Sequence, residues 1–171
     1  TGIVIPDKVS TLGTYVFQNC QSLASVIFDG NKVTAIGMYA FEKCSSLTAI
    51  TIPTSVTTIN NYAFANSGLT SIVIPANVNV MGSYVFQNCV SLRTAEFKGS
   101  TIATSTSARN AGKLAPYSFQ NCSSLTSVIL PANLKTIDYY AFDGCSQLVI
   151  EIPEKVTSIT TSTSNARAFG S

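Results

Sequence analysis

A short pattern that recurs from one end of this chain to the other constrains its fold more than any other feature. The clearest copy, residues 39–53, reads Tyr-x-Phe-x-x-Cys-x-x-Leu-x-x-Ile-x-Ile-Pro. Its phenylalanine returns roughly every 23 residues, a period typical of stacked repeat units. One unit cannot bury its own apolar positions, so successive units must pack on one another. The sequence therefore predicts a solenoid with repeats anchored at Phe17, Phe41, Phe64, Phe86, Phe119, Phe142 and Phe169.

Each repeat contains two apolar segments that predict the path of one coil. Apolar residues alternate over three positions, which predicts a short strand with one buried face, at residues 26–28, 50–52, 72–74, 95–97, 128–130 and 150–152. Proline follows most of these segments and cannot donate to a neighbouring strand, so it ends the ladder. A second apolar pair, such as Val56 and Ile59, predicts a weaker second edge. The Tyr-x-Phe-x-x-Cys segment predicts one helical or 3₁₀ turn.

The combined motif Leu-x-x-Ile-x-Ile-Pro, Val-x-x-Ile and Ala-Phe-x-x-Cys resembles the BspA-like leucine-rich repeats of bacterial surface proteins. The resemblance covers nearly the whole chain. It implies a right-handed leucine-rich repeat solenoid, mainly β with short 3₁₀ or helical turns and a parallel sheet on its concave side. We expect residues 1–171 to form one domain of about seven repeats within a longer repeat protein.

Composition narrows the classes of function. With 46% hydrophobic and 11% charged residues, the chain can build a core and lacks the profile of disorder. The net charge of +2 comes from scattered Lys and Arg, which argues against a nucleic-acid partner. Apolar runs are far shorter than the roughly 20 residues of a membrane helix, which argues against membrane insertion.

Few residues are suited to chemistry. The chain has no histidine, and its carboxylates are dispersed, so we expect neither an enzyme nor a bound metal or cofactor. The five cysteines occupy the same position in five of the repeats and lack Cys-x-x-Cys spacing. We favour a reduced, buried cysteine ladder over a metal site or disulfides.

Three surfaces are candidates for binding. Residues that alternate outward from the strands form the first: Ser25, Ile27, Ala49, Thr51, Ser71, Val73, Thr94, Glu96, Ser127, Ile129 and Glu151. Two insertions of similar composition form the second, expected on one edge, with Arg109, Asn110, Lys113 and Arg167 as their binding candidates. The third is an aromatic stripe two residues before each phenylalanine: Tyr15, Tyr39, Tyr62, Tyr84, Tyr117 and Tyr140. We favour ring stacking for these tyrosines over a row of partner anchors.

The resemblance implies a secreted or cell-surface adhesion module without enzyme activity, whose export signal is not in the given chain. The partner would be a host matrix or serum protein, another cell-surface protein, or a glycan. A structural spacer that displays other domains is the alternative, and an enzyme is a distant one. Within this chain the strand face is our first candidate site, the insertions are the second, and the absence of any site is the third.

Overall fold

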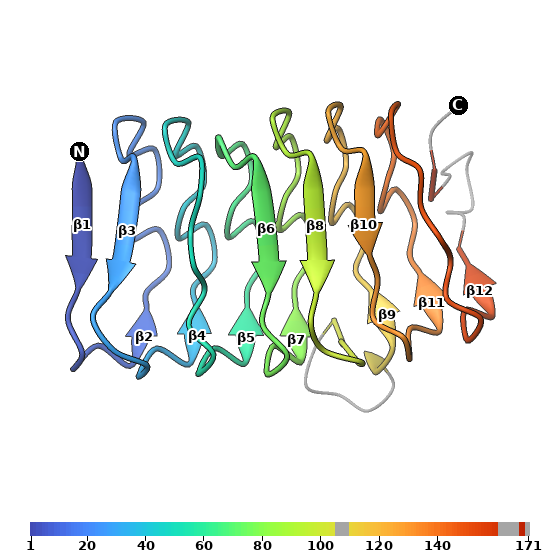
Figure 1. Cartoon of the computed structure of the whole chain (residues 1–171), viewed down its shortest axis with the longest axis horizontal. Coiled ribbons are helices and arrows are strands. Elements are labelled where there is room, and N and C mark those ends of the chain that lie inside the picture. The colour runs from blue at the N-terminus through green and yellow to red at the C-terminus, as the bar shows by residue number, and fades with distance from the viewer. Residues whose placement is uncertain (105–109, 161–167, 170–171) are drawn as a thin grey trace.

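The computed structural model is a stack of parallel coils, with the first and last strands, β1 and β12, at opposite ends of the stack (Figure 1). It describes residues 1–104, 110–160 and 168–169. Strands of successive coils lie side by side and pair in parallel. This arrangement confirms the predicted leucine-rich repeat solenoid.

The longer strands lie on one face, which we call the long-strand face. They are β1 (Gly2–Ile5), β3 (Ser25–Phe28), β6 (Ser71–Ile74), β8 (Thr94–Phe97) and β10 (Ser127–Ile129). Strand β1 pairs with β3, whereas β6, β8 and β10 form a separate three-stranded sheet. Side chains alternate between solvent and core, as the two-residue period of a strand requires. In β6, for example, Ser71 and Val73 are exposed while Ile72 and Ile74 are buried.

Two of the strands predicted from the sequence, at residues 50–52 and 150–152, do not form. Within the described residues, no hydrogen bond involves a main-chain N–H or C=O of residues 49–52. We call residues 49–52 the unpaired segment. The prediction was wrong because alternation reports which side chains are buried, and Ile52 is buried without any ladder. The long-strand face is therefore interrupted between β3 and β6.

A second row of short parallel strands runs along the lower edge in Figure 1. These strands pair in the orders β2-β4-β5-β7 and β9-β11-β12. Apolar residues such as Leu12, Ile36 and Ile59 are buried, which confirms the predicted weaker second edge, whereas Ile159 of the last strand is exposed. The strands are β2 (Thr11–Leu12), β4 (Ala35–Ile36), β5 (Thr58–Ile59), β7 (Val80–Met81), β9 (Lys113–Leu114), β11 (Thr136–Ile137) and β12 (Ser158–Ile159).

The Tyr-x-Phe-x-x-Cys segments form the third side of each coil, which we call the turn edge. In the second coil Tyr39 and Lys43 have φ values of 57° and 59°, in the left-handed region, so the segment is not the regular helical or 3₁₀ turn that was predicted. Alternate amides reach the next coil, whereas the amides between them donate within the turn, as Glu42 N–H does to the Tyr39 carbonyl at 3.2 Å. Phe41 N–H donates to the Ala63 carbonyl at 2.8 Å, and Lys43 N–H donates to the Ala65 carbonyl at 2.9 Å.

Phenylalanine rings from the turn edge fill the core. Successive rings from Phe17 to Phe169 stack with centroids 5.2 to 5.6 Å apart. The five inner rings are buried, whereas Phe17 and Phe169 at the ends of the stack are half-buried. Each ring thus depends on the coils on both sides for its burial, as stacking of the repeats predicts.

Candidate interaction surface

The strand register brings the predicted outward residues of the long-strand face into two rows. Ser71, Thr94 and Ser127 are direct neighbours and form a small polar row. Val73, Glu96 and Ile129 form the adjacent row. On the other side of the interruption, Ile27 pairs with Val4 and Ser25 with Gly2. Of the eleven candidates on this face, Glu96 is half-buried and the rest are exposed.

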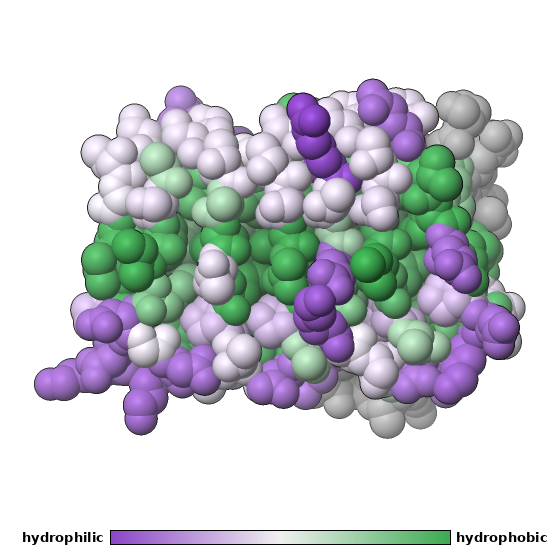
Figure 2. All heavy atoms as spheres, viewed as in Figure 1, coloured by the Kyte–Doolittle hydropathy of each residue, from purple (hydrophilic) through white to green (hydrophobic). Residues whose placement is uncertain are grey.

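Apart from Glu96, the second row is apolar, and Val4 and Ile27 continue it on the other side of the interruption. The side chains of Val4, Ile27, Val73 and Ile129 are 47 to 59% exposed although each belongs to a paired strand. Figure 2 shows the result as a hydrophobic band across this face, framed by more polar residues. Sequence reasoning missed Val4, although the alternation Ile3-Val4-Ile5 carries the same signal as the later strands.

One charged pair interrupts the apolar row. The Nζ atom of Lys98 donates a hydrogen bond to the Glu96 carboxylate. Both side chains remain partly accessible to solvent. The pair therefore gives the otherwise apolar row one charged position of each sign.

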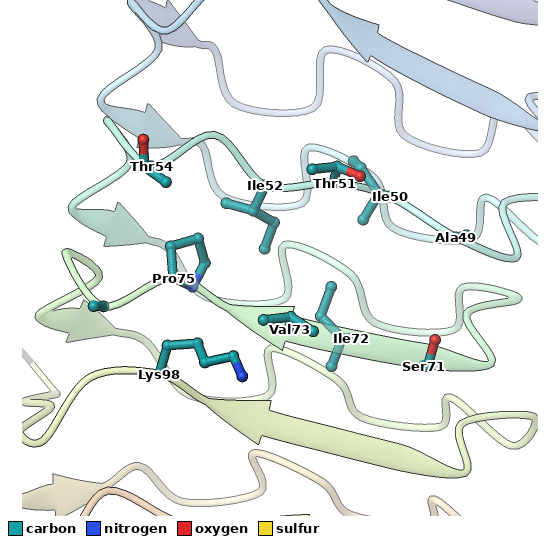
Figure 3. A pocket seen from close by; sticks show the side chains of 11 residues that line it. Ala49, Ile50, Thr51, Ile52, Thr54, Ser71, Ile72, Val73, Pro75 and Lys98 are labelled. Atoms are coloured by element: carbon teal, nitrogen blue, oxygen red, sulfur yellow. The ribbon is translucent and has the colours of Figure 1, made fainter.

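Grooves lie on both sides of the unpaired segment. The larger, of about 570 Å³, lies between this segment and β6 and includes Ile52, Val73, Pro75 and Lys98 in its lining (Figure 3). The smaller, of about 300 Å³, lies between the segment and β3. A third groove, of about 390 Å³, lies between β10 and residues 149–154, where the other predicted strand is missing. Both missing strands thus coincide with grooves on the long-strand face.

Sequence reasoning did not find these grooves. Among their lining residues, Pro75, Ala76 and Lys98 follow strands and were not among the predicted site residues. The local sequence carries no signal for the larger groove, because Ala49-Ile50-Thr51-Ile52 and Ser71-Ile72-Val73-Ile74 have the same alternation. Only one of the two segments pairs.

The predicted tyrosine stripe is a continuous ring stack. Neighbouring rings from Tyr15 to Tyr140 have centroids 4.4 to 5.1 Å apart and interplanar angles of 6 to 19°. The six residues share a left-handed φ of 55 to 63°. Stacking occupies the ring faces, so edges and hydroxyl groups are what the stripe presents to solvent.

The hydroxyl groups of the central tyrosines interact with one another. Burial is the main cause that raises the pKa of Tyr62, Tyr84 and Tyr117 above the ordinary value. The charges of neighbouring phenol groups raise the pKa of each hydroxyl further, whereas hydrogen bonding to Tyr84 lowers that of Tyr62 and hydrogen bonding to Tyr117 lowers that of Tyr84. These side chains therefore stay neutral at physiological pH and act as hydrogen-bonding groups.

The insertion candidates are only partly described. Arg109 and Arg167 lie outside the described residues, and so does the expected common edge of the two insertions. Asn110 is half-buried. Lys113 belongs to β9, the first strand of the second short-strand sheet, and pairs with Thr136 of β11.

The cysteines form the predicted ladder, which is fully buried at its three central members and more exposed at Cys20 and Cys145. Cys44, Cys89 and Cys122 are buried, and every cysteine is a free thiol. The Cys89 thiol donates to the Phe64 carbonyl of the preceding coil at 3.1 Å. Burial raises the pKa of Cys44 and of Cys89 to about 11. Contrary to the prediction of one buried position, Cys20 is exposed and Cys145 is half-buried; Cys20 lies in the first coil of residues 1–171, which contain no preceding coil to cover it.

In the third repeat a serine takes the place of the cysteine, a replacement not recognised from the sequence. Ser67 occupies the position three residues after Phe64 and is buried. Its hydroxyl lies 3.3 Å from the sulfur of Cys89. The ladder therefore continues through this coil with oxygen in place of sulfur.

Within residues 1–104, 110–160 and 168–169, no cluster of three or more His, Cys, Asp or Glu side chains could hold a metal ion. The same part of the chain contains no helix that is both long and apolar enough to cross a membrane.

Comparison with known proteins gives a consistent family assignment. The sequence pattern described as the BspA type leucine rich repeat region (6 copies) matches residues 1–108 and 94–165. None of the curated proteins compared with this chain matches it.

Solved structures show the same fold. A leucine-rich repeat protein from Bacteroides ovatus is 30% identical with a TM-score of 0.84, over 94% of this chain and 39% of that protein. The T. pallidum leucine-rich repeat protein TpLRR is 29% identical with a TM-score of 0.82, over 95% of this chain and 74% of that protein. The chain thus spans 39% of the Bacteroides protein and 74% of TpLRR. It belongs to the BspA-type leucine-rich repeat family.

Proposed function

We propose that this chain is a non-enzymatic protein-interaction module of a secreted or cell-surface protein, and that it binds its partner through the long-strand face. The exposed apolar row at Val4, Ile27, Val73 and Ile129 carries this proposal. Exposed apolar side chains gathered on one face of a folded domain mark contact sites for other macromolecules. Membership of the BspA-type family supports the surface location and a host matrix, serum or cell-surface protein as partner.

The proposal can be tested by placing charge along the row. Thr51, Val73, Glu96 and Ile129 are replaced together by arginine, and beads that display each variant are added to wells coated with extracellular-matrix extract or serum proteins. We expect the unmodified chain to adhere and the quadruple variant to lose adhesion, because buried unpaired charge opposes association. Circular dichroism and the thermal midpoint report whether the variant is folded.

A second variant separates the remaining alternatives. Arg109 and Arg167 in the two insertions are replaced by alanine. If this variant loses adhesion and the quadruple variant keeps it, the insertions are the binding site and the proposal is wrong. A structural spacer would tolerate both sets of substitutions.

A further inference from the structure

The third groove of the long-strand face, between β10 and residues 149–154, is distinguished by its charge. Its volume is about 390 Å³, and two exposed glutamates, Glu151 and Glu154, line it. Within the described residues, neither glutamate makes an ion pair. In the larger groove Lys98 already pairs with Glu96, and none of the described residues that line the smallest groove is charged. We call the third groove the acidic groove.

The acidic groove also has an apolar wall. Ile129 and Val149 line it, and their side chains are 56% and 82% exposed. Aliphatic surface of this kind gains free energy when a partner removes it from water. In Figure 2, hydrophobic and hydrophilic side chains adjoin on this part of the face. The groove therefore suits an occupant that is aliphatic along its length and positively charged at its end.

Main-chain bonds between the two coils limit the size of that occupant. The Val149 N–H donates to the Thr126 carbonyl at 3.1 Å at one end of the groove, and the Thr157 N–H donates to the Lys135 carbonyl at 2.9 Å beyond its other end. The coils are thus as close as neighbouring strands, and a further strand does not fit between them. Known ligand pockets range from about 300 to 1,000 Å³, so this one is small. A single side chain that enters from solvent matches it.

The nearby lysines leave the two carboxylates available to a partner. Lys155 follows Glu154 in the chain, but its Nζ atom donates to the side-chain oxygen of Asn133. Lys98, which follows β8, donates to the Glu96 carboxylate. A cation from a partner therefore meets carboxylates that no lysine of the described residues already binds.

Among cations, arginine fits the acidic groove best. Its aliphatic stem packs on apolar surface while its charged end reaches polar groups. The guanidinium group presents five donors in a fixed plane and is more weakly hydrated than an ammonium group, so it can bond two carboxylates at once. A calcium ion would need about six to eight oxygen ligands, and the described residues contain no cluster of three or more candidate ligands.

We propose that the acidic groove is the docking site for one arginine side chain of the partner protein. The arginine stem lies against Ile129 and Val149, and its guanidinium group donates to the carboxylates of Glu151 and Glu154. Apolar residues that flank the arginine in the partner cover the exposed row of the long-strand face. The inference rests on the proposed function, because it specifies how the partner is anchored on that face.

Two capped peptides test the docking in solution. They are Leu-Ala-Arg-Ala-Leu and a copy with citrulline, which keeps the length and planar end of arginine but lacks its charge. In NMR titrations we expect the arginine peptide to shift the amide signals of residues 127–132 and 149–154. The citrulline peptide should bind about tenfold more weakly. Equal binding of the two peptides, no binding of the arginine peptide, or shifts confined to other coils would overturn the inference.

A matched pair of double variants tests the two carboxylates. Glu151→Gln with Glu154→Gln removes both charges and keeps the side-chain shape. The control, Asp7→Asn with Asp29→Asn, removes two charges from exposed positions outside the groove. We expect only the glutamine variant to weaken the arginine peptide about tenfold, with unchanged thermal midpoints for both. Equal weakening by both variants would show a general effect of net charge and would contradict the docking mode.

A bulky side chain tests the groove itself. Ala132 and Ala76 both follow a proline at the same position of their repeats, and Ala132 lines the acidic groove whereas Ala76 lines the larger one. We expect Ala132→Trp to abolish binding of the arginine peptide and Ala76→Trp to retain it. The opposite result would place the arginine in the larger groove.

Adhesion distinguishes this inference from the proposed function. Matrix or serum proteins on the wells are treated with an arginine deiminase that converts their arginines to citrulline, and we expect the unmodified chain to lose adhesion to them. If the glutamine variant adheres normally while the quadruple arginine variant does not, the groove inference fails and the proposed function stands. If the arginine peptide binds in the groove but the unmodified chain adheres to no protein, the proposed function fails and the preference of the groove for arginine is supported.

Discussion

The turn edge and the long-strand face are built from the same repeat, yet only the turn edge is continuous. At the turn edge, tyrosine and phenylalanine rings stack along the coils, and main-chain bonds join each coil to the next. On the long-strand face the ladder is broken between β3 and β6. The turn edge, together with the pairing of β4 with β5, therefore holds the coils in register where the long-strand face is interrupted.

This difference separates stability from recognition. The turn edge combines ring burial with hydrogen bonds, and its polar side chains also form ladders, as between Gln87, Gln120 and Asp143. The long-strand face leaves apolar side chains exposed and main-chain groups unpaired. Substitutions at the turn edge should therefore change the free energy of unfolding, while those on the face should mainly change binding.

The largest expected effect is at the centre of the phenylalanine stack. Phe64 is fully buried and stacks on Phe41 and Phe86. Phe64→Ala removes that burial and leaves a cavity, so we expect a loss of about 3 to 5 kcal/mol in the free energy of unfolding, measured by urea denaturation.

Two other substitutions set the scale for Phe64→Ala. Phe17→Ala, at the half-buried end of the stack, should lower the free energy of unfolding clearly less than Phe64→Ala does. Ile27→Ala on the long-strand face should change stability by only about 0.5 kcal/mol. A cost for Ile27→Ala as large as that for Phe64→Ala would contradict the division between stabilising edge and binding face.

A smaller effect is expected in the tyrosine stack. Tyr84 stacks on Tyr62 and Tyr117 at 4.4 Å and has a φ of 63°. Tyr84→Ala loses two ring contacts, worth about 1 to 3 kcal/mol together, and keeps a backbone conformation that alanine disfavours. Tyr84→Gly loses the same contacts but adopts a positive φ at no steric cost. We therefore expect the glycine variant to be more stable than the alanine variant by about 1 kcal/mol in urea denaturation. The reverse order would show that the left-handed conformation is not retained in solution.

Much of the fold follows from the repeat itself. The period, the alternation and the prolines predict parallel stacking, the buried phenylalanine and cysteine positions, and a second weak edge. The turn conformation could not be predicted, because tyrosine ordinarily avoids a positive φ. Tyr39 adopts it where its ring stacks on two neighbours and its amide donates to the Asn61 carbonyl of the next coil. Such stabilisation depends on contacts between coils, which the sequence of one repeat does not contain.

The candidate site was predicted less completely than the fold. Alternation placed Val73 and Ile129 on the exposed face, because the side of the strand on which a residue lies is a local property. Whether a segment such as Thr51 and its neighbours pairs is decided by the spacing between coils at that face. The grooves could therefore be recognised only in the structure. Lys98 is a candidate only because it lines a groove formed with residues of other repeats.

The smallest expected effect concerns a single atom in the ladder at the turn edge. Cys89→Ser puts into the fourth coil the hydroxyl that Ser67 already supplies in the third, so we expect a loss of only about 1 kcal/mol at pH 8. Burial raises the pKa of Cys89 from 9.0 to about 11, so the folded chain holds this proton more tightly than the unfolded chain. Its contribution to stability is complete below pH 9 and is lost as the pH rises to 11. Urea denaturation at pH 8 and pH 10 under reducing conditions should therefore show a smaller alkaline decline for Cys89→Ser than for the unmodified chain. Equal declines would mean that the thiol is ionised as easily in the folded chain as in the unfolded one, which its burial and its bond to the Phe64 carbonyl oppose.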